Sequence, residues 1–354
     1  MSTKLALYED DTQSWGLIEA DALLTLAKLP DACVDSIVCD PPYGIGITGE
    51  AWDGSDIRRV AGSNGERPSP GEAFERWTKI WATEAARVLK PGGHLVAFGA
   101  PRTFHRLVAG VEDAGLEVRD QLLWLYGSGI PKSRRWPGGL GTALKPAYEP
   151  ILLARAPLDG TTPQNLDAWG TGVLNIQAAR VGSQRYWPGN IALSHGPDCP
   201  AQLLNNPGTD LSRLFYCPKT SRAEREAGCE QLAARLAPLY TGSSRKPRVL
   251  RNIHPTVKPL ELMRWLVKLV TPSGGLVLDP FSGSGSTGAA AVLEGRRFLG
   301  IEREGQYVDV ACARLTHWAH EARESAWGLD GPPAGGRTSV FLPADKAIQP
   351  KGGK

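Results

Sequence analysis

Apolar and polar positions change period repeatedly along this chain, from the period of two of a strand to the period near 3.6 of a helix. Short, β-branched apolar runs predict buried strands at 34–39, 94–98, 116–126, 148–155, 276–279 and 298–301. Amphipathic stretches predict helices at 22–29, 72–89, 101–114 and 260–270, an Ala-rich helix that ends at Leu293, and a last helix at about 306–319. Strands that alternate with helices in this way predict an α/β fold with a doubly wound, mostly parallel sheet.

Two long stretches lack this periodicity. Residues 44–71 are rich in Gly, Ser, Asp and Pro, and loops of that length are usually functional lids or disordered. Residues 127–253 are irregular apart from the strand at 148–155, and the end of the chain is rich in Gly and Pro. The predicted organisation is a first half-domain at 1–126, an insert at 127–253, a second half-domain at 254–321 and a flexible tail at 322–354.

Composition narrows the class of protein. Of the 354 residues, 42% are hydrophobic and 22% are charged, which is typical of a globular protein. No apolar run reaches the roughly 20 residues that span a bilayer, the N-terminus is polar and acidic, and the six cysteines follow no disulfide framework. We therefore expect a cytoplasmic protein with reduced thiols and no membrane contact. The net charge of +3 neither favours nor excludes a nucleic-acid partner.

The run at 34–39 ends in Asp40-Pro41-Pro42-Tyr43. Prolines cannot donate to a ladder, so the acid and the aromatic ring lie at the carboxyl end of a strand, where open α/β sheets hold their ligands. A carboxylate, fixed backbone carbonyls and a flat ring suit a planar base that carries an exocyclic amino group. The simpler interpretation is a strand that ends in a Pro-Pro turn with a surface tyrosine, and these four residues alone do not decide between the two.

A second candidate site follows the strand at 276–279. The sequence Asp279-Pro280-Phe281-Ser282-Gly283-Ser284-Gly285-Ser286-Thr287-Gly288 joins that strand to a helix, and Glu302 ends the next strand. Glycines let the backbone approach a ligand, amides at a helix N-terminus face it, and an acid roughly 20 residues on suits ribose hydroxyls. The spacing is neither the dinucleotide fingerprint nor a P-loop, so it indicates a nucleoside site of another kind.

Basic residues flank the irregular middle of the chain, with aromatic residues between them. The candidate nucleic-acid-binding residues are Lys132, Arg134, Arg135, Arg245, Lys246 and Arg248. Charged runs of this kind usually mark solvated surface, but basic loops with interleaved aromatics also fit a face that follows a phosphate backbone.

Together with His254-Pro255-Thr256-Val257-Lys258-Pro259, the two motifs resemble those of the S-adenosylmethionine-dependent DNA amino-methyltransferases. Their order, with the catalytic motif first and the cofactor loop last, resembles that of the β class. The resemblance covers about residues 18–320, and the segment 145–150 is similar to members found in phages and prophages. It implies a Rossmann-like methyltransferase sheet whose inserted irregular region recognises the DNA target.

The resemblance also assigns residues. By the family's pattern, the residues that hold the target base and act in catalysis are Asp40, Pro41, Pro42 and Tyr43. Those that line the cofactor, S-adenosylmethionine, are Asp279, Pro280, Phe281, Gly283, Gly285, Thr287, Glu302, Thr256, Lys258 and Asp21.

The implied reaction is methyl transfer to the exocyclic N6 of adenine in double-stranded DNA, after the base has flipped out of the duplex. An amino nitrogen on a purine is a poor nucleophile because its lone pair is delocalised into the ring. Hydrogen bonds from its N–H groups to the Asp40 carboxylate and the Pro41 carbonyl would free that lone pair, so the reaction is mostly positioning and electrostatics. Tyr43 would stack on the flipped base, and no metal is required.

Several alternatives stay open. Methylation of cytosine N4 would use the same motif, although Asp at position 40 is more typical of adenine enzymes. A non-catalytic DNA-binding protein, a protein or RNA amino-methyltransferase and a nicotinamide oxidoreductase fit the order of the motifs less well. A zinc site built from His195, Cys199, Cys217 and Cys229 has irregular spacing. A homodimer and a cognate restriction nuclease are both compatible with the family.

Overall fold

The computed structural model describes residues 6–10, 12, 14–46, 49–62, 67–126, 136–181, 185–194, 215–236 and 249–327. A ten-stranded sheet crosses this part of the chain in the order β1-β2-β12-β11-β3-β4-β6-β5-β7-β8. Its strands are β1 Ala6–Glu9, β2 Trp15–Glu19, β3 Val34–Cys39, β4 Leu89–Phe98, β5 Glu117–Tyr126, β6 Tyr148–Arg155, β7 Ile191–Ser194, β8 Phe215–Tyr216, β11 Leu276–Asp279 and β12 Arg297–Glu302. A separate two-stranded ladder joins β9 Arg235–Leu236 to β10 Val249–Leu250.

Most neighbouring strands of the large sheet are parallel. The run β2-β12-β11-β3-β4 is parallel throughout, whereas β6 is antiparallel to both of its neighbours, β4 and β5. The strand β1 adds an antiparallel edge next to β2. The prediction of a mostly parallel sheet is confirmed.

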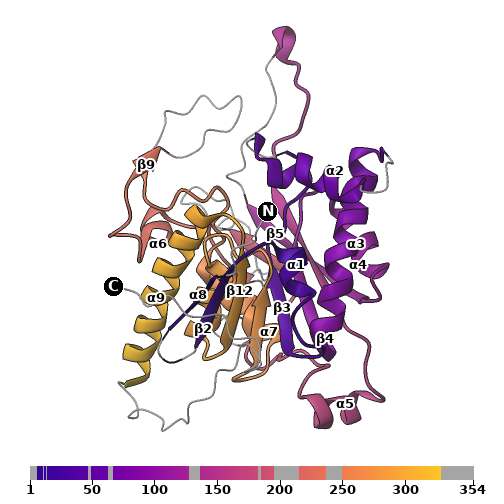
Figure 1. Cartoon of the computed structure of the whole chain (residues 1–354), viewed down its shortest axis with the longest axis vertical. Helices are drawn as coiled ribbons and strands as arrows, with labels where there is room; N and C mark the ends of the chain where they lie inside the picture. The colour runs from indigo at the N-terminus through magenta and orange to yellow at the C-terminus, as the bar shows by residue number, and fades with distance from the viewer. Residues whose placement is uncertain are drawn as a thin grey trace, which may run out of the picture.

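Helices cover both faces of this sheet. They are α1 Ala22–Leu26, α2 Ser55–Ala61, α3 Pro70–Val88, α4 Phe104–Glu112, α5 Thr162–Trp169, α6 Arg222–Glu226, α7 Leu260–Val270, α8 Ser286–Leu293 and α9 Gly305–Trp327, with 3-10 turns η2 Ala51–Asp53 and η3 Pro137–Gly139. In Figure 1 the orange and yellow α8 and α9 lie on one side of the sheet and the purple α3 and α4 on the other. The buried side chains of α7 belong to the same core cluster as those of α8 and α9. The doubly wound arrangement is confirmed.

Alternation along the central strands divides the core between the two faces. In β3, Val38 packs into the cluster that contains the buried side chains of α7, α8 and α9. Its neighbours Ile37 and Cys39 pack into the cluster that contains those of α3 and α4. A strand buried on both faces explains why this segment reads as a continuous apolar run.

The helix α3 shows how the sequence sets these elements. Ser69 and Glu72 form a capping box at its start, and Pro70 occupies the first turn, where its missing N–H costs nothing. Its buried residues recur at helical spacing and include Phe74, Trp77 and Trp81. This face packs against the sheet and the neighbouring helices.

Three predicted boundaries differ from the structure. The loop predicted at 44–71 contains η2 and α2, which periodicity missed because Ile57 is the one residue of α2 that is buried and no side chain caps the helix. The strand predicted at 94–98 begins at Leu89 as β4, with a register shift next to its partner β3. The last helix continues to Trp327 and enters the segment predicted as a flexible tail.

The N-terminal strands β1 and β2 were not predicted, because each is short and Gly16 interrupts the apolar pattern of β2. The predicted boundary at residue 126 also separates β5 from β6, to which it is hydrogen-bonded. Where residues 127–253 are described, they contribute β6, β7 and β8 to the main sheet. None of the helices in the described part of the chain combines the length and apolar character needed to cross a bilayer.

The packing of α3 gives a direct test. Trp81 is fully buried, so Trp81→Ala should lower the free energy of unfolding by about 3–5 kcal/mol, measured by urea denaturation. The adjacent Ile80 is 41% exposed, and Ile80→Ala is the matched control that should cost about 1 kcal/mol or less. Equal losses in the two variants would contradict this account of the core.

Candidate active site

The two predicted motifs meet at one edge of the sheet. Because β11 lies parallel beside β3, with Leu278 opposite Ile37, their carboxyl ends adjoin although more than 200 residues separate them in sequence. One pocket opens at this edge. Its lining includes Asp21, Asp40, Pro41, Pro42, Tyr43, Thr256, Lys258, Asp279, Pro280, Phe281, Gly283, Thr287 and Glu302. The remaining predicted cofactor residue, Gly285, instead forms the N-cap of α8 with a φ of 73°.

The backbone of the Asp40–Tyr43 motif is held by residues that the sequence did not single out. Thr103 donates its hydroxyl to the carbonyl oxygen of Tyr43 at 2.7 Å. Asp53, which is fully buried, accepts the N–H of Gly44 at 2.7 Å. The segment after the strand is therefore fixed from two sides, by α4's N-terminal turn and by η2.

Four side chains form a polar cluster at Asp40, namely Asp40 itself, Tyr43, Lys258 and Glu149. The Tyr43 hydroxyl donates to Asp40 Oδ1 at 2.6 Å, and Lys258 Nζ forms an ion pair with Asp40 Oδ2. Lys258 Nζ also lies 3.5 Å from Glu149 Oε2, and the Tyr43 hydroxyl lies 3.3 Å from the same oxygen. Lys258, which was predicted to line the cofactor, thus pairs with the Asp40 carboxylate, and the sequence analysis did not select Glu149 as a site residue.

Burial and neighbouring charges have opposite effects on the pKa values of Asp40 and Lys258. Burial raises the pKa of Asp40, and the ammonium of Lys258 opposes that rise. Burial lowers the pKa of Lys258, but the carboxylates of Asp40 and Glu149 outweigh burial and the net pKa is raised. Lys258 therefore keeps its charge at neutral pH and favours the ionised form of Asp40.

The glycine loop is shaped by two carboxylates. Asp279 accepts the N–H of Phe281 at 3.0 Å and the hydroxyl of Thr287 at 2.6 Å. Glu302 accepts the N–H of Gly283 at 2.8 Å. Burial raises the pKa of Asp279 and that of Glu302 to about 7 each. Both acids accept hydrogen bonds from the loop and also line the pocket.

Two residues from outside the glycine loop contact it, His254 and Arg314. A Cβ at Gly283 would come within 2.6 Å of His254 Nε2, and the φ of Gly283 is 52°, so a larger residue there is excluded twice. Burial lowers the pKa of His254 to about 3, so its ring is neutral. Arg314 of α9, fully buried, donates to the carbonyl oxygen of Ser284 at 2.6 Å. In the sequence, His254 was noted only as part of the segment 254–259, and no pattern indicated a role for Arg314.

Asp21 has a structural role beside its place in the pocket lining. Its Oδ1 accepts the N–H groups of Leu23 and Leu24 and so caps α1. The candidate DNA-binding residues Lys132, Arg134, Arg135, Arg245, Lys246 and Arg248 all lie outside the described residues.

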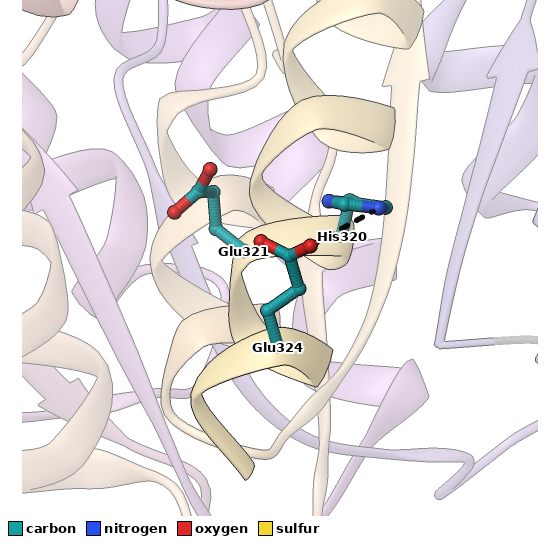
Figure 2. A group of neighbouring side chains, drawn as sticks. All are labelled: His320, Glu321 and Glu324. Atoms are coloured by element: carbon teal, nitrogen blue, oxygen red, sulfur yellow. Dashed lines mark ion pairs between the residues drawn. The ribbon is translucent and has the colours of Figure 1, made fainter. Parts of the chain in front are cut away.

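Potential metal ligands were also compared with the structure. Of the four residues considered for zinc, Cys217 and Cys229 are buried free thiols, and His195 and Cys199 lie outside the described residues. Figure 2 shows His320, Glu321 and Glu324 on α9, whose ligand atoms lie within 4.8 Å of one another. All of these last three are exposed, and exposed acidic groups are common without an ion, so no metal role follows.

A family model described as DNA methylase, N6_N4_Mtase, matches residues 34–313. The chain belongs to this DNA methylase family. The match spans both motifs and the segment between them, so the predicted family is confirmed, together with the methyltransferase fold and the S-adenosylmethionine dependence that the family implies.

Individual relatives agree with this membership. The methylase is 25% identical over 342 residues to the Type II methyltransferase M.HindIII of Haemophilus influenzae, covering 84% of this chain and 94% of the relative. It is 27% identical over 314 residues to the DNA adenine methyltransferase YhdJ of Escherichia coli, covering 87% and 85%. Among solved structures, the cytosine-N4-specific PvuII DNA methyltransferase superposes with a TM-score of 0.55 at 16% identity, covering 91% of this chain and 96% of that one. That last likeness establishes the fold.

The raised pKa of Glu302 predicts a pH-dependent affinity for S-adenosylmethionine. Below about pH 7 the carboxyl is protonated, whereas the ionised form is the better acceptor for ribose hydroxyls. Binding should therefore release a proton, and affinity should rise up to about tenfold between pH 6 and pH 8, measured by calorimetry. In Glu302→Gln the profile should lose the contribution of Glu302 and keep that of Asp279, whose pKa is also raised to about 7. Glu112→Gln, at an exposed position of α4 outside the pocket, is the control that should keep the wild-type slope, and an unchanged slope in Glu302→Gln would refute the assignment.

Proposed function

We propose that this DNA methylase transfers the methyl group of S-adenosylmethionine to the exocyclic N6 of adenine in double-stranded DNA. The observation that carries the proposal is the Asp40 carboxylate, whose side chain is 17% exposed and which follows a strand beside the Pro41 carbonyl and shares one pocket with the glycine loop. The similarity to M.HindIII and to the DNA adenine methyltransferase YhdJ supports the choice of base.

The residues present fit S-adenosylmethionine. The buried carboxylates of Asp279 and Glu302 suit the ammonium and hydroxyl groups of such a ligand, and the positive φ of Gly283 lets the backbone approach it. Apolar lining comes from Phe281 and from Ile57 of α2. When bound, this molecule supplies a methyl group on a positively charged sulfur.

The residues around Asp40 suit an amino group as the acceptor of that methyl group. Lys258 favours the ionised carboxylate, which accepts hydrogen bonds and donates none. An amino group that donates to Asp40 and to the Pro41 carbonyl is drawn out of conjugation with its ring, so its lone pair becomes available. Because burial raises the pKa of Asp40, this carboxylate also suits the role of acceptor for the proton that the methylated nitrogen must lose.

The proposal extends to the partner, the localisation and the origin of the protein. The name of M.HindIII as a Type II methyltransferase supports a cognate restriction nuclease as a partner, and the absence of a spanning helix among the described residues is compatible with the cytoplasm. The segment 145–150 supports a phage or prophage origin by its resemblance alone. A homodimer stays a prediction from the family.

Replacing the catalytic acid tests the proposed chemistry. Asp40→Ala should reduce turnover at least about a hundredfold, by analogy with the loss of one electrostatic contact to a transition state. It should still bind S-adenosylmethionine in calorimetry, because the glycine loop keeps Asp279 and Glu302. The assay is transfer of tritiated methyl groups to duplex DNA, followed by nucleoside analysis.

The product of the wild-type enzyme decides the base. N6-methyladenine is the expected product. N4-methylcytosine as the sole product would leave the role of Asp40 in place and overturn the choice of base, whereas near-wild-type turnover in Asp40→Ala would overturn the mechanism.

The basic residues of the middle segment give a second test. Charge-neutral replacement of Lys132, Arg134, Arg245 and Arg248 should weaken DNA binding across sequences and flatten its salt dependence, because each phosphate contact contributes about one unit to the salt slope. The control is Lys79→Gln on α3, where the ammonium is paired with Asp113 at 3.3 Å. If the salt slope is unchanged after all four replacements, the DNA-binding face lies elsewhere.

A further inference from the structure

Glu149 brings a second carboxylate into the catalytic centre from outside the three motifs. It lies near the start of β6, the strand hydrogen-bonded to both β4 and β5. Its side chain is 20% exposed and its Oε2 faces both the Tyr43 hydroxyl at 3.3 Å and Lys258 Nζ at 3.5 Å. On the other side, Tyr126 donates its hydroxyl to Glu149 Oε1 at 3.3 Å. Contacts to both oxygens fix the orientation of this carboxylate.

The Tyr43 hydroxyl has two acceptors and one proton. It donates to Asp40 Oδ1 at 2.6 Å, and Glu149 Oε2 lies at 3.3 Å. A hydroxyl can satisfy one of them fully at a time, and the shorter distance shows that Asp40 is the acceptor in this structure. The Tyr43 hydroxyl therefore takes one of the two acceptor positions on the oxygen that the proposed reaction needs for the amino group, and an amino group that approaches from that side has to displace it.

An amino group that binds Asp40 Oδ1 competes with this hydroxyl. A buried hydroxyl that loses its acceptor is costly, because burial removes the water that would otherwise replace it. Glu149 Oε2 is close enough to receive the hydroxyl after a small rotation of the O–H bond. The exchange then leaves every donor satisfied, since the amino group takes Asp40 while Tyr43 keeps a carboxylate partner.

We propose that Glu149 is a positioning residue for the methyl-accepting base: it receives the Tyr43 hydroxyl when the amino group takes that hydroxyl's place on Asp40. This role rests on the proposed function, because it requires an amino group at Asp40. It involves hydrogen bonds alone, so no covalent bond changes. Lys258 and Tyr126 contact the two oxygens of Glu149 and orient its carboxylate towards Tyr43.

The test compares two DNA duplexes at the recognition sequence that methylation mapping of wild-type DNA identifies. One duplex carries adenine at the target position and the other carries purine, which lacks the 6-amino group. Only adenine displaces the Tyr43 hydroxyl from Asp40. Glu149→Ala should therefore weaken binding to the adenine duplex about tenfold, as expected for one unsatisfied buried hydroxyl, and change binding to the purine duplex less than about twofold.

A double-mutant cycle identifies the residue through which Glu149 acts. In a Tyr43→Phe background there is no hydroxyl to move, so Glu149→Ala should then have little effect on binding to the adenine duplex. Glu149→Gln keeps an acceptor oxygen and should restore most of the affinity lost in Glu149→Ala. Binding, not turnover, is the readout, so the cycle can be read even where Tyr43→Phe is catalytically slow.

Controls separate this exchange from other causes. Glu117→Ala removes a carboxylate that pairs with Arg155 at 2.6 Å on the same sheet and should not discriminate between the duplexes. An equal loss on both duplexes, an equal loss in the Tyr43→Phe background, or a Glu149→Gln variant as weak as Glu149→Ala would each overturn the proposal. The last result would point to charge acting through Lys258. Absence of N6-methyladenine in the mapping would instead overturn the proposed function itself.

Discussion

The parallel pairing of β3 with β11 is the constraint on which the site depends. It aligns Ser36 with Val277 and Ile37 with Leu278, and it places Asp40 and Asp279 at neighbouring strand ends. The Asp40–Tyr43 motif lies early in the sequence and the glycine loop after Asp279 lies late, yet they line one pocket. The two motifs can therefore form one site although they are far apart in the sequence, because the sheet determines which strand ends are neighbours.

An ion pair also joins the end of β3 to the segment that precedes α7. Lys258 comes from the segment before α7 and pairs with Asp40, which follows β3. Buried ion pairs contribute little net stability, because removing two ions from water costs about as much as their attraction returns. Here one ammonium faces the two carboxylates of Asp40 and Glu149. We infer that this cluster is retained for the chemistry of Asp40 and contributes little to the stability of the fold.

Much of the fold and half of the site could be predicted from the sequence, for physical reasons. Strands buried on both faces give uninterrupted apolar runs, and prolines or glycines mark where they end, so Asp40 and the loop after Asp279 could be placed at strand ends. Glu149 could not be placed, because its position depends on β6 inserting antiparallel between β4 and β5. A period of two along a strand carries no information about its direction or its neighbours. Arg314 was missed for a similar reason, since α9 must first pack beside α8 before its guanidinium can reach Ser284.

The short helix α2 illustrates a further limit of pattern reading and a property of the pocket. Its sequence has one buried residue, Ile57, and no capping side chain, so neither periodicity nor capping marks it. Ile57 and Val60 nevertheless line the pocket, and Arg303, which follows β12, pairs with Asp56 at 3.1 Å. The rest of the pocket wall comes largely from strand ends that are fixed on both sides by the sheet. Besides Ile57 and this ion pair, Val60 is partly buried and packs against the cluster that contains Phe74 and Trp77 of α3. One wall of the pocket is therefore supplied by a helix that neither periodicity nor capping marks in the sequence.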